Sequence, residues 1–326
     1  MVPIIQVSID GRDVSSGVAA RILEGEVVQH DGGHGDECHL LISNFDGRLA
    51  KPARGGLIDV RVGFAATGVR SLGQFKVQEI AKHGPKAHFS VVGHGVDLIT
   101  SLKAQHTRVW NQTTLGAILG TLAGENGLTL AIDGKLGATA VTTLAQTHES
   151  DMHLITRLAR HYGAIGKPMG GRLLFIPKGA GTSASGATLP PIVVTPNDLE
   201  GSFTISTSDR PKRGKVVAHH FDRGTGKREQ VSHDTGDGGP DYHLPHMYGD
   251  AASAQAACAA RATDFKAAKG TFKGTLKSGD NQMQAGGVLT SQGFGDDDDH
   301  DWIIKRVPHR FGDHGYVTGF DAEVKR

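Results

Sequence analysis

Apolar and polar residues alternate at the start of the chain. Ile5, Val7 and Ile9 would share one face of an extended segment that ends in a turn at Asp10. This is the pattern of a half-buried β-strand. Five further segments of this kind follow, separated by turn-forming residues, at 25–30, 38–43, 57–64, 75–80 and 88–92. We therefore predict an antiparallel β domain over residues 1–97.

Helical spacing then replaces the alternation. Apolar residues recur three and four positions apart within 115–122 and again within 150–162, which predicts two amphipathic helices. Gly163 can supply the left-handed cap of the second helix, and a short apolar strand follows it. The Gly- and Ser-rich stretch 179–191 has the composition of a linker. We predict a small α/β insert over residues 98–191.

Strand-like segments return in the last part of the chain, at 203–206, 215–220, 230–232, 271–277, 287–290, 302–307 and 316–324. One Ala-rich stretch, 250–269, interrupts them and has strong helix propensity. We predict a second β domain over residues 192–326 that contains this helix. The fold class is then mainly β (α+β), with two β domains around an α/β insert.

The two β domains share two pairs of similar segments. Residues 25–43 align without gaps with 214–232, and residues 75–93 align with 302–320. The two segments of the second pair are further apart in the sequence than those of the first pair, and the extra residues can hold the helix at 250–269. Two matches in the same order predict a duplicated β domain, although strands punctuated by Gly also resemble one another by chance. The shared apolar positions of the second pair are Phe75 and Trp302, Val77 and Ile304, Ile80 and Val307, and Phe89 and Tyr316.

Composition restricts the functional classes. The 35 basic and 34 acidic side chains leave a formal net charge of +1, whereas domains that grip nucleic acid are usually strongly basic. No apolar run approaches the roughly 18 residues that a membrane-spanning helix needs, and the N-terminal segment lacks the basic start of a signal peptide. We expect synthesis in the cytoplasm, where Cys38 and Cys258 would stay reduced; a single disulfide between them is the alternative.

Several histidines invite a metal-binding interpretation. His34, Cys38 and His39 lie close together in the sequence, as do His309 and His314. Neighbouring residues of a strand point to opposite faces, so Cys38 and His39 would diverge. The HExxH spacing of zinc hydrolases is absent from the sequence. We therefore interpret these residues as turn and surface histidines.

The acidic run 296–299, followed by His300 and Asp301, is the densest charge cluster. Its carboxylates lack the alternate spacing of a calcium-binding loop, so a solvated hairpin loop is the first interpretation. A negative patch that keeps passing DNA from sticking to a channel wall is the functional alternative. A metal-dependent hydrolase built on the His and Asp clusters is the rival function from another class. We expect no cofactor, no bound metal and no catalytic residue.

Three passages resemble one known family. Residues 149–179 contain a helix with an acidic start that ends in LARHYG and a strand that reads GRLLFIPKG, residues 253–276 contain an Ala-rich helix before a Gly-containing strand, and residues 302–326 form the ending. Together they resemble the late control D family, the tail hubs of contractile-tailed phages, and the hub part of type VI secretion spike proteins. In the ending, the residues in register with the family pattern are Trp302, Val307, His309, Gly315, Tyr316 and Thr318.

The resemblance implies a structural role without catalysis. It implies two tube-forming, antiparallel β-barrel-like domains in each chain and a homotrimer that joins a sixfold tail tube to a threefold central spike. It also implies partners: the central spike protein, tail tube or tube-initiator proteins, baseplate wedge or arm proteins, and DNA in transit. The expected location is the tail baseplate of a virion, after assembly in the host cytoplasm. A tailocin or type VI-like injection hub is the alternative.

The helix at 250–269 belongs to only one of the two β domains, so it would break their equivalence. We predict that it packs across a junction between adjacent tube-like domains, within one chain or between chains. Its small Ala side chains permit close approach because they have no rotamer entropy to lose. The residues predicted to pack between domains or subunits are Ala256, Ala260, Phe265, Trp302 and Tyr316.

Overall fold

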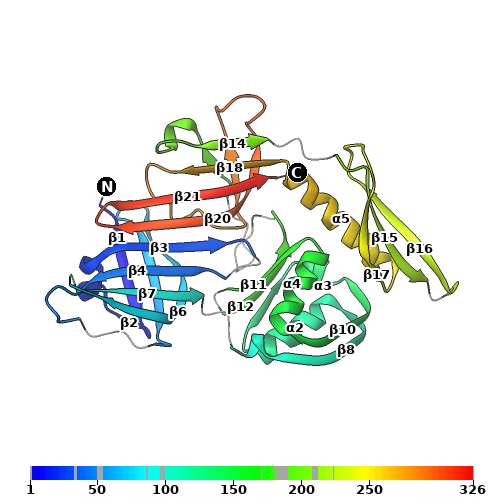
Figure 1. Ribbon diagram of the computed structural model, residues 1–326, viewed down its shortest axis with the longest axis horizontal. Coiled ribbons are helices and arrows are strands. Elements are labelled where there is room, and N and C mark those ends of the chain that lie inside the picture. Colours follow the sequence, from blue (N-terminus) through cyan, green and yellow to red (C-terminus); the bar gives the residue numbers. More distant parts are fainter. Residues whose placement is uncertain are drawn as a thin grey trace.

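The computed structural model describes residues 2–325 except 33–34, 50–53, 86, 96–99, 170, 180, 182–189, 208–211 and 223. The predicted linker at 179–191 falls largely outside the described residues. The chain is mainly β, as its sequence predicts. Figure 1 shows four parts, which we call the first β unit, the insert, the second β unit and the lateral unit.

The first β unit is one sheet that bends so that side chains from distant strands pack in a common core. The strands pair in the order β3-β4-β7-β6-β5-β1-β2. Side chains of β1 and β5, such as Val7 and Val60, pack in the same core as Val27 of β3 and Leu40 of β4. The strands are β1 (Ile4–Ile9), β2 (Arg12–Asp13), β3 (Ile22–His30), β4 (Glu37–Ser43), β5 (Leu57–Phe64), β6 (Gly68–His83) and β7 (His88–Gly95), with the short helices α1 (Ser15–Val18) and η1 (Ala19–Arg21) after β2.

The second β unit repeats this arrangement. Its strands pair in the order β14-β18-β21-β20-β19-β13, and Trp302 is buried in its core with Phe272 and Phe320. The elements are β13 (Ile192–Val194), η3 (Pro196–Asp198), β14 (Thr204–Thr207), β18 (Gly270–Thr275), β19 (Val288–Ser291), β20 (Asp301–Gly312) and β21 (Gly315–Val324).

The predicted match between 75–93 and 302–320 is confirmed in strand position. The hairpin β6-β7 corresponds to β20-β21, and both hairpins have a register shift at the same place, between Val77 and Glu79 and between Ile304 and Arg306. The gapless alignment fails beyond the turn, because β20-β21 continues for two more residue pairs. Phe89 therefore corresponds to Thr318, and its predicted equivalence with Tyr316 is wrong.

The predicted match between 25–43 and 214–232 is wrong. The predicted partner segment forms a hairpin of β15 (Lys215–Asp222) and β16 (Lys227–Asp234) in a separate sheet. The strands that occupy the places of β3 and β4 are β14 and β18. Hairpins with apolar alternation and Gly turns look alike in sequence whichever sheet they join. One difference remains within the repeat: β1 is antiparallel to β5, whereas β13 is parallel to β19.

The lateral unit is the actual addition to the second repeat, and it is larger than the predicted helix. It interrupts the connection between β14 and β18 and projects from the rest of the molecule (Figure 1). Small residues of its helix, including Ala254, Cys258 and Ala262, pack directly on Val216 and Ala218 of the sheet. The elements are β15 (Lys215–Asp222), β16 (Lys227–Asp234), β17 (Tyr242–Tyr248) and α5 (Ala251–Ala267).

The insert is an α/β unit between the two repeats. Helices α2 and α4 cover the sheet β11-β12-β9 beside the two-stranded antiparallel sheet β8-β10. Thr114 and Ser150 cap the two helices with their side chains, and Gly163 adopts φ 62° after α4. The elements are η2 (Thr100–Lys103), β8 (Gln105–Thr114), α2 (Leu115–Glu125), β9 (Thr129–Ile132), α3 (Gly134–Gly137), β10 (Ala140–Ser150), α4 (Asp151–His161), β11 (Ala164–Met169) and β12 (Arg172–Pro177).

A buried carboxylate ties the elements of the insert together. Asp151 is 1% exposed and accepts hydrogen bonds from Arg108 at 2.7 Å, Gln146 at 2.8 Å and Asn126 at 3.1 Å. These donors come from β8, β10 and the end of α2. The desolvated charge is therefore matched by a guanidinium and two amides, which is the condition for a buried ion to be tolerated.

We expect Asp151→Ala to lower the free energy of unfolding by about 3 kcal/mol, because it leaves Arg108 and two buried amides without their acceptor. Glu125→Ala is the matched control, since Glu125 binds the same guanidinium at 2.7 Å from an exposed position. We expect a loss below about 1 kcal/mol for the control. Equal losses in urea unfolding would contradict the role of burial.

Candidate functional site: the junction of the β units and the cavity beside helix α5

The two β units are joined edge to edge into one continuous sheet. β3 pairs antiparallel with the second half of β20 through seven residue pairs, from Arg306 opposite His30 to Gly312 opposite Glu24. The Asp31 N–H donates to the Lys305 carbonyl at 3.0 Å, so every second pair along this ladder is hydrogen-bonded. Pro308 has no N–H and falls at one of the intervening pairs, where none is required.

A large side chain over a glycine closes the junction. A Cβ atom at Gly25 would lie 2.2 Å from the ring of Phe311, so only glycine fits there. Phe311 and Tyr316 are buried in the core of the first β unit, although both belong to the second. The ring of Tyr316 lies 5.7 Å from that of Phe64. The tip of the β20-β21 hairpin therefore completes the core of its neighbour.

Polar side chains hold the two units in one orientation. The Asn281 amide donates to the carbonyls of Val62 and Gly68, both at 3.0 Å. Arg310 donates to Glu26 across the β3-β20 ladder at 2.9 Å. These contacts need both units in place, so they select one mutual orientation.

The insert holds the same junction from one end. Lys167 of β11 donates to the carbonyl of His30 at the end of β3 and lies 3.4 Å from the Asp36 carboxylate. Lys305 of β20 forms an ion pair with Asp31. Cationic groups from the insert and from the second β unit thus meet oxygen atoms of the first.

The sheet face outside the cores carries balanced charge near the junction. Arg306 lies 3.7 Å from Asp321 and Lys305 lies 3.9 Å from Glu323, and both are cross-strand pairs between β20 and β21. His39, on the same face of β4, is exposed and lies 3.6 Å from Glu37. Pairs of this kind leave little net field over the surface.

His309 is buried beside the junction. Its Nδ1 atom lies 2.9 Å from the Tyr316 hydroxyl and 3.2 Å from the Thr318 hydroxyl. Burial lowers the pKa of His309 to about 3, so the imidazole is neutral at pH 7. The interpretation of His309 as a turn or surface histidine is wrong; it belongs to the strand pattern of β20.

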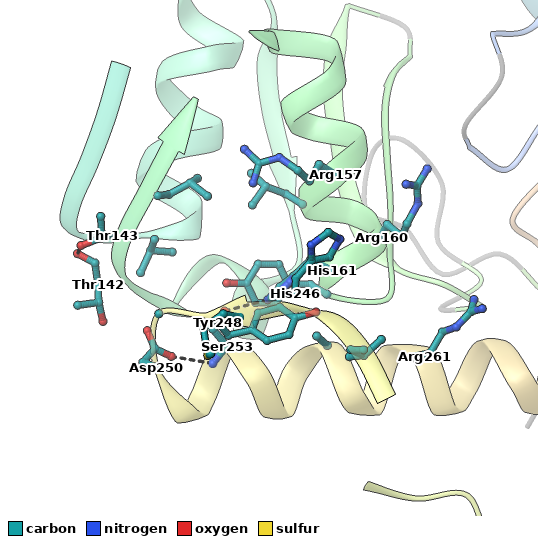
Figure 2. Close-up of a pocket in the computed structure, with 18 of the residues that line it drawn as sticks. Thr142, Thr143, Arg157, Arg160, His161, His246, Tyr248, Asp250, Ser253 and Arg261 are labelled. Atoms are coloured by element: carbon teal, nitrogen blue, oxygen red, sulfur yellow. Dashed lines mark hydrogen bonds between the residues drawn. The ribbon is translucent and has the colours of Figure 1, made fainter. Parts of the chain in front are cut away.

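A cavity of about 550 Å³ lies between α4 and β10 of the insert and α5 and β17 of the lateral unit (Figure 2). Arg157, Arg160 and Arg261 line it, but Arg157 is held by Glu149 at 2.7 Å and Arg261 lies near Asp264. His161 lies 3.1 Å from the Ser253 hydroxyl, and burial lowers the pKa of His161 to about 4. Two of the three arginines of the cavity are therefore already next to carboxylates of the same chain.

The structure separates the residues predicted to pack between domains. Ala260 of α5 is buried against Gly163 at the end of α4, where a Cβ atom at the glycine would lie 3.3 Å away. Ala256 is half-buried, and the ring of Phe265 packs on Tyr242 at 5.0 Å, within the lateral unit. Trp302 lies in the core of the second β unit, and Tyr316 lies at the junction.

Helix α5 packs on the lateral sheet and on α4. Within one chain it does not cross the junction of the β units, so that form of the prediction is wrong, and packing between chains stays a prediction. Sequence reasoning missed Phe311, Gly25 and Asn281, which make the junction. A glycine inside a strand pattern was the available signal, because it often marks close approach of another group.

The residues weighed as metal ligands in the sequence do not converge in the described part of the chain. His34 lies outside it. Cys38 is buried, and burial raises the pKa of its thiol to about 12, while His39 is exposed on the opposite face of β4. In the 296–299 run, Asp299 accepts hydrogen bonds from the backbone N–H groups of Gly293 and Phe294. No group of three metal-binding side chains is found among the described residues.

The chain is similar to known tail proteins. The profile of the family "Phage tail baseplate hub (GPD)" matches residues 90–315. A "Probable baseplate hub protein" of Escherichia phage 186 is 24% identical and covers 100% of this chain and 94% of its own length. A tail protein of Neisseria meningitidis MC58 has a TM-score of 0.74 at 11% identity, with 100% of this chain and 97% of that protein covered. An E. coli component of the type VI secretion system has a TM-score of 0.61 at 12% identity, with 98% and 77% covered.

We expect Gly25→Val to lower the free energy of unfolding by about 2 kcal/mol, because Phe311 must move to admit the new side chain. Glu24→Val, at the exposed neighbouring position, is the control and should change it by less than about 0.5 kcal/mol. Urea unfolding measures both. An unchanged midpoint for Gly25→Val would show that the packing of Phe311 is not tight.

The pKa of His309 also predicts acid sensitivity. The folded-state pKa of His309 is about 3, below the ordinary 6.5. The contribution of the neutral imidazole to the free energy of unfolding is therefore complete above pH 6.5 and is lost as pH falls toward 3. We expect the free energy of unfolding to fall by up to about 1.4 kcal/mol per pH unit in this window relative to His309→Gln. His88→Gln, at a half-exposed position, should follow the unsubstituted chain. Parallel curves for the unsubstituted chain and His309→Gln would refute the assignment.

Proposed function

We propose a structural role for this chain, which belongs to the phage tail baseplate hub (GPD) family. In this proposal it is the hub of a contractile tail baseplate and acts by assembly, not by catalysis. Three copies form a ring that joins the sixfold tail tube to the threefold central spike. Its place is the virion tail, reached after assembly in the host cytoplasm.

One observation carries this proposal: the two β units are repeats that share a continuous sheet. A chain with two equivalent units can fill two equivalent places of a ring, so three chains supply six similar positions to a sixfold neighbour. The same three chains remain threefold through their inserts and lateral units, which occur once per chain. The domain assignment that follows is 1–97 and 192–326 for the tube-forming parts, the second interrupted by the lateral unit over 215–267, and 98–191 for the insert.

The charge pattern supports a conduit for DNA. The formal net charge is +1, and the sheet face near the junction pairs its charges across strands, as Arg306 does with Asp321. A basic wall would bind phosphates and slow a passing duplex. A balanced face gives DNA little to hold.

The proposed partners follow from the position of a hub. The central spike protein lies on one side, tail tube or tube-initiator proteins on the other, and wedge or arm proteins around the ring. A tailocin or type VI-like injection hub is the second candidate, favoured by the likeness of fold to the E. coli type VI component. Among the described residues, no helix is long and apolar enough to cross a membrane.

We expect the purified chain to have three times its 34.3 kDa mass by native mass spectrometry and to form a pseudo-sixfold ring in electron micrographs. Elemental analysis of the same sample tests the rival metal-dependent hydrolase and should find no stoichiometric metal. A monomer at every concentration would overturn the hub proposal. So would a tightly bound ion accompanied by hydrolytic activity.

A further inference from the structure

Each β unit has a second strand edge that the junction leaves open. In the second β unit it is the outer edge of β14, which pairs only with β18 among the described strands. In the first β unit it is the end of β6, residues 79–83, beyond the last residue that pairs with β5. Exposed strand edges present rows of N–H and C=O groups that can receive another strand.

These two open edges are the equivalents of the two edges already joined within the chain. β5 pairs with the first half of β6 through Leu57 and Lys76, as β19 pairs with the first half of β20 through Val288 and Ile303. The second half of β20 receives β3. The second half of β6 is its equivalent, and β14 is the equivalent of β3.

The ladders fix which residues correspond. Across the sheet, Val27 lies opposite Cys38, and Cys38 opposite Gly93. In the second unit Ile205 lies opposite Phe272, and Phe272 opposite Ala322. Gly93 lies opposite Val77 and Ala322 lies opposite Ile304. Val77 and Ile304 each stand directly before the register shift of their hairpin.

Val27 therefore corresponds to Ile205, and by the same count from the register shift His309 corresponds to Lys82. Because His309 lies opposite Val27 in the chain's own junction, the equivalent contact between copies would place Lys82 opposite Ile205.

We propose that copies of the chain join by pairing β14 of one copy, antiparallel, with residues 80–83 of β6 in the next. His83 then lies opposite Thr204, Lys82 opposite Ile205, Ala81 opposite Ser206 and Ile80 opposite Thr207. This inference rests on the proposed ring and specifies the interface that closes it. The occupant of each open edge is a second copy of this chain.

An exposed phenylalanine at the matching position supports the pairing. In the chain's own junction Phe311 covers Gly25. The equivalent pair between copies is Gly84 and Phe203, with the large and small residues exchanged between the strands. Phe203 is 42% exposed, and a Cβ atom at Gly84 would meet nothing within 4 Å. The open edge thus has both a large apolar side chain and a place for it.

The backbone at this edge is also suitably oriented. His309 belongs to a hydrogen-bonded pair with β3, by alternation from the Asp31–Lys305 bond. Its equivalent Lys82 therefore directs its N–H and C=O toward the open edge, away from β7. Ala81 corresponds to Pro308 and falls, with Ser206, at a pair that needs no hydrogen bond.

Cysteine pairs test the register. Non-hydrogen-bonded antiparallel pairs have Cα atoms about 4.5 Å apart, within the range of a disulfide. Under mild oxidation, Ala81→Cys combined with Ser206→Cys should give covalent trimers on a denaturing gel. Ala81→Cys with Thr204→Cys, displaced by two residues on the same face, is the control and should not. The native Cys38 and Cys258 are both buried and should not interfere.

A proline tests the edge itself. Lys82→Pro removes an N–H that points away from β7, so the fold should be kept with an unchanged circular dichroism spectrum. The ladder between copies loses a donor, and we expect the trimer to dissociate at least tenfold more readily on dilution. Lys82→Ala keeps the N–H and should behave like the unsubstituted chain.

The outcomes separate the two proposals. A trimeric unsubstituted chain whose 81/206 pair does not cross-link, or a Lys82→Pro variant that stays trimeric, overturns the edge pairing and leaves the hub proposal standing. A chain that is monomeric at every concentration overturns the hub proposal first. Cross-linking of the 81/204 control at the same rate shows that the register is wrong.

Discussion

The antiparallel pairing of β3 with β20 is the interaction on which the rest of the molecule depends. It joins the sheets of the two β units into one continuous sheet, and it places the tip of the β20-β21 hairpin in the core of the first β unit. The close approach of Phe311 to Gly25 makes this pairing selective, because no side chain fits beneath the ring. The insert and the lateral unit are attached to this continuous sheet but contribute none of its described strands.

The sequence was most informative where a pattern reports a local property. Alternation located most strands of the two β units, and helical spacing located the start of α2 and both ends of α4 and α5 within one or two residues. It failed where the question was which sheet a hairpin joins. The segments β3-β4 and β15-β16 have similar alternation and turns, but alternation records only that one face is buried. β14, the true counterpart of β3, has four residues and little signal of its own.

The candidate site was the harder part to predict, since its residues come from distant parts of the chain. Tyr316 was identified as a packing residue, yet its partner Phe64 and the neighbouring Gly25 gain meaning only once β20 lies beside β3. His309 shows the same limit. A histidine at an alternating strand position can face either side, and only the completed core shows that it is buried.

The exchange of large and small residues between the two junctions has a consequence for fidelity. In the proposed ring, β14 could in principle meet β20 of another copy, but Phe203 would then confront Phe311. β3 could meet β6, but Gly25 would then face Gly84 and leave a gap. Each mismatch would disfavour the wrong pairing sterically, through one residue on each edge. A ring that follows this matching of large and small residues must alternate first and second β units. The order of the units around the ring would then be fixed before any spike or tube protein binds.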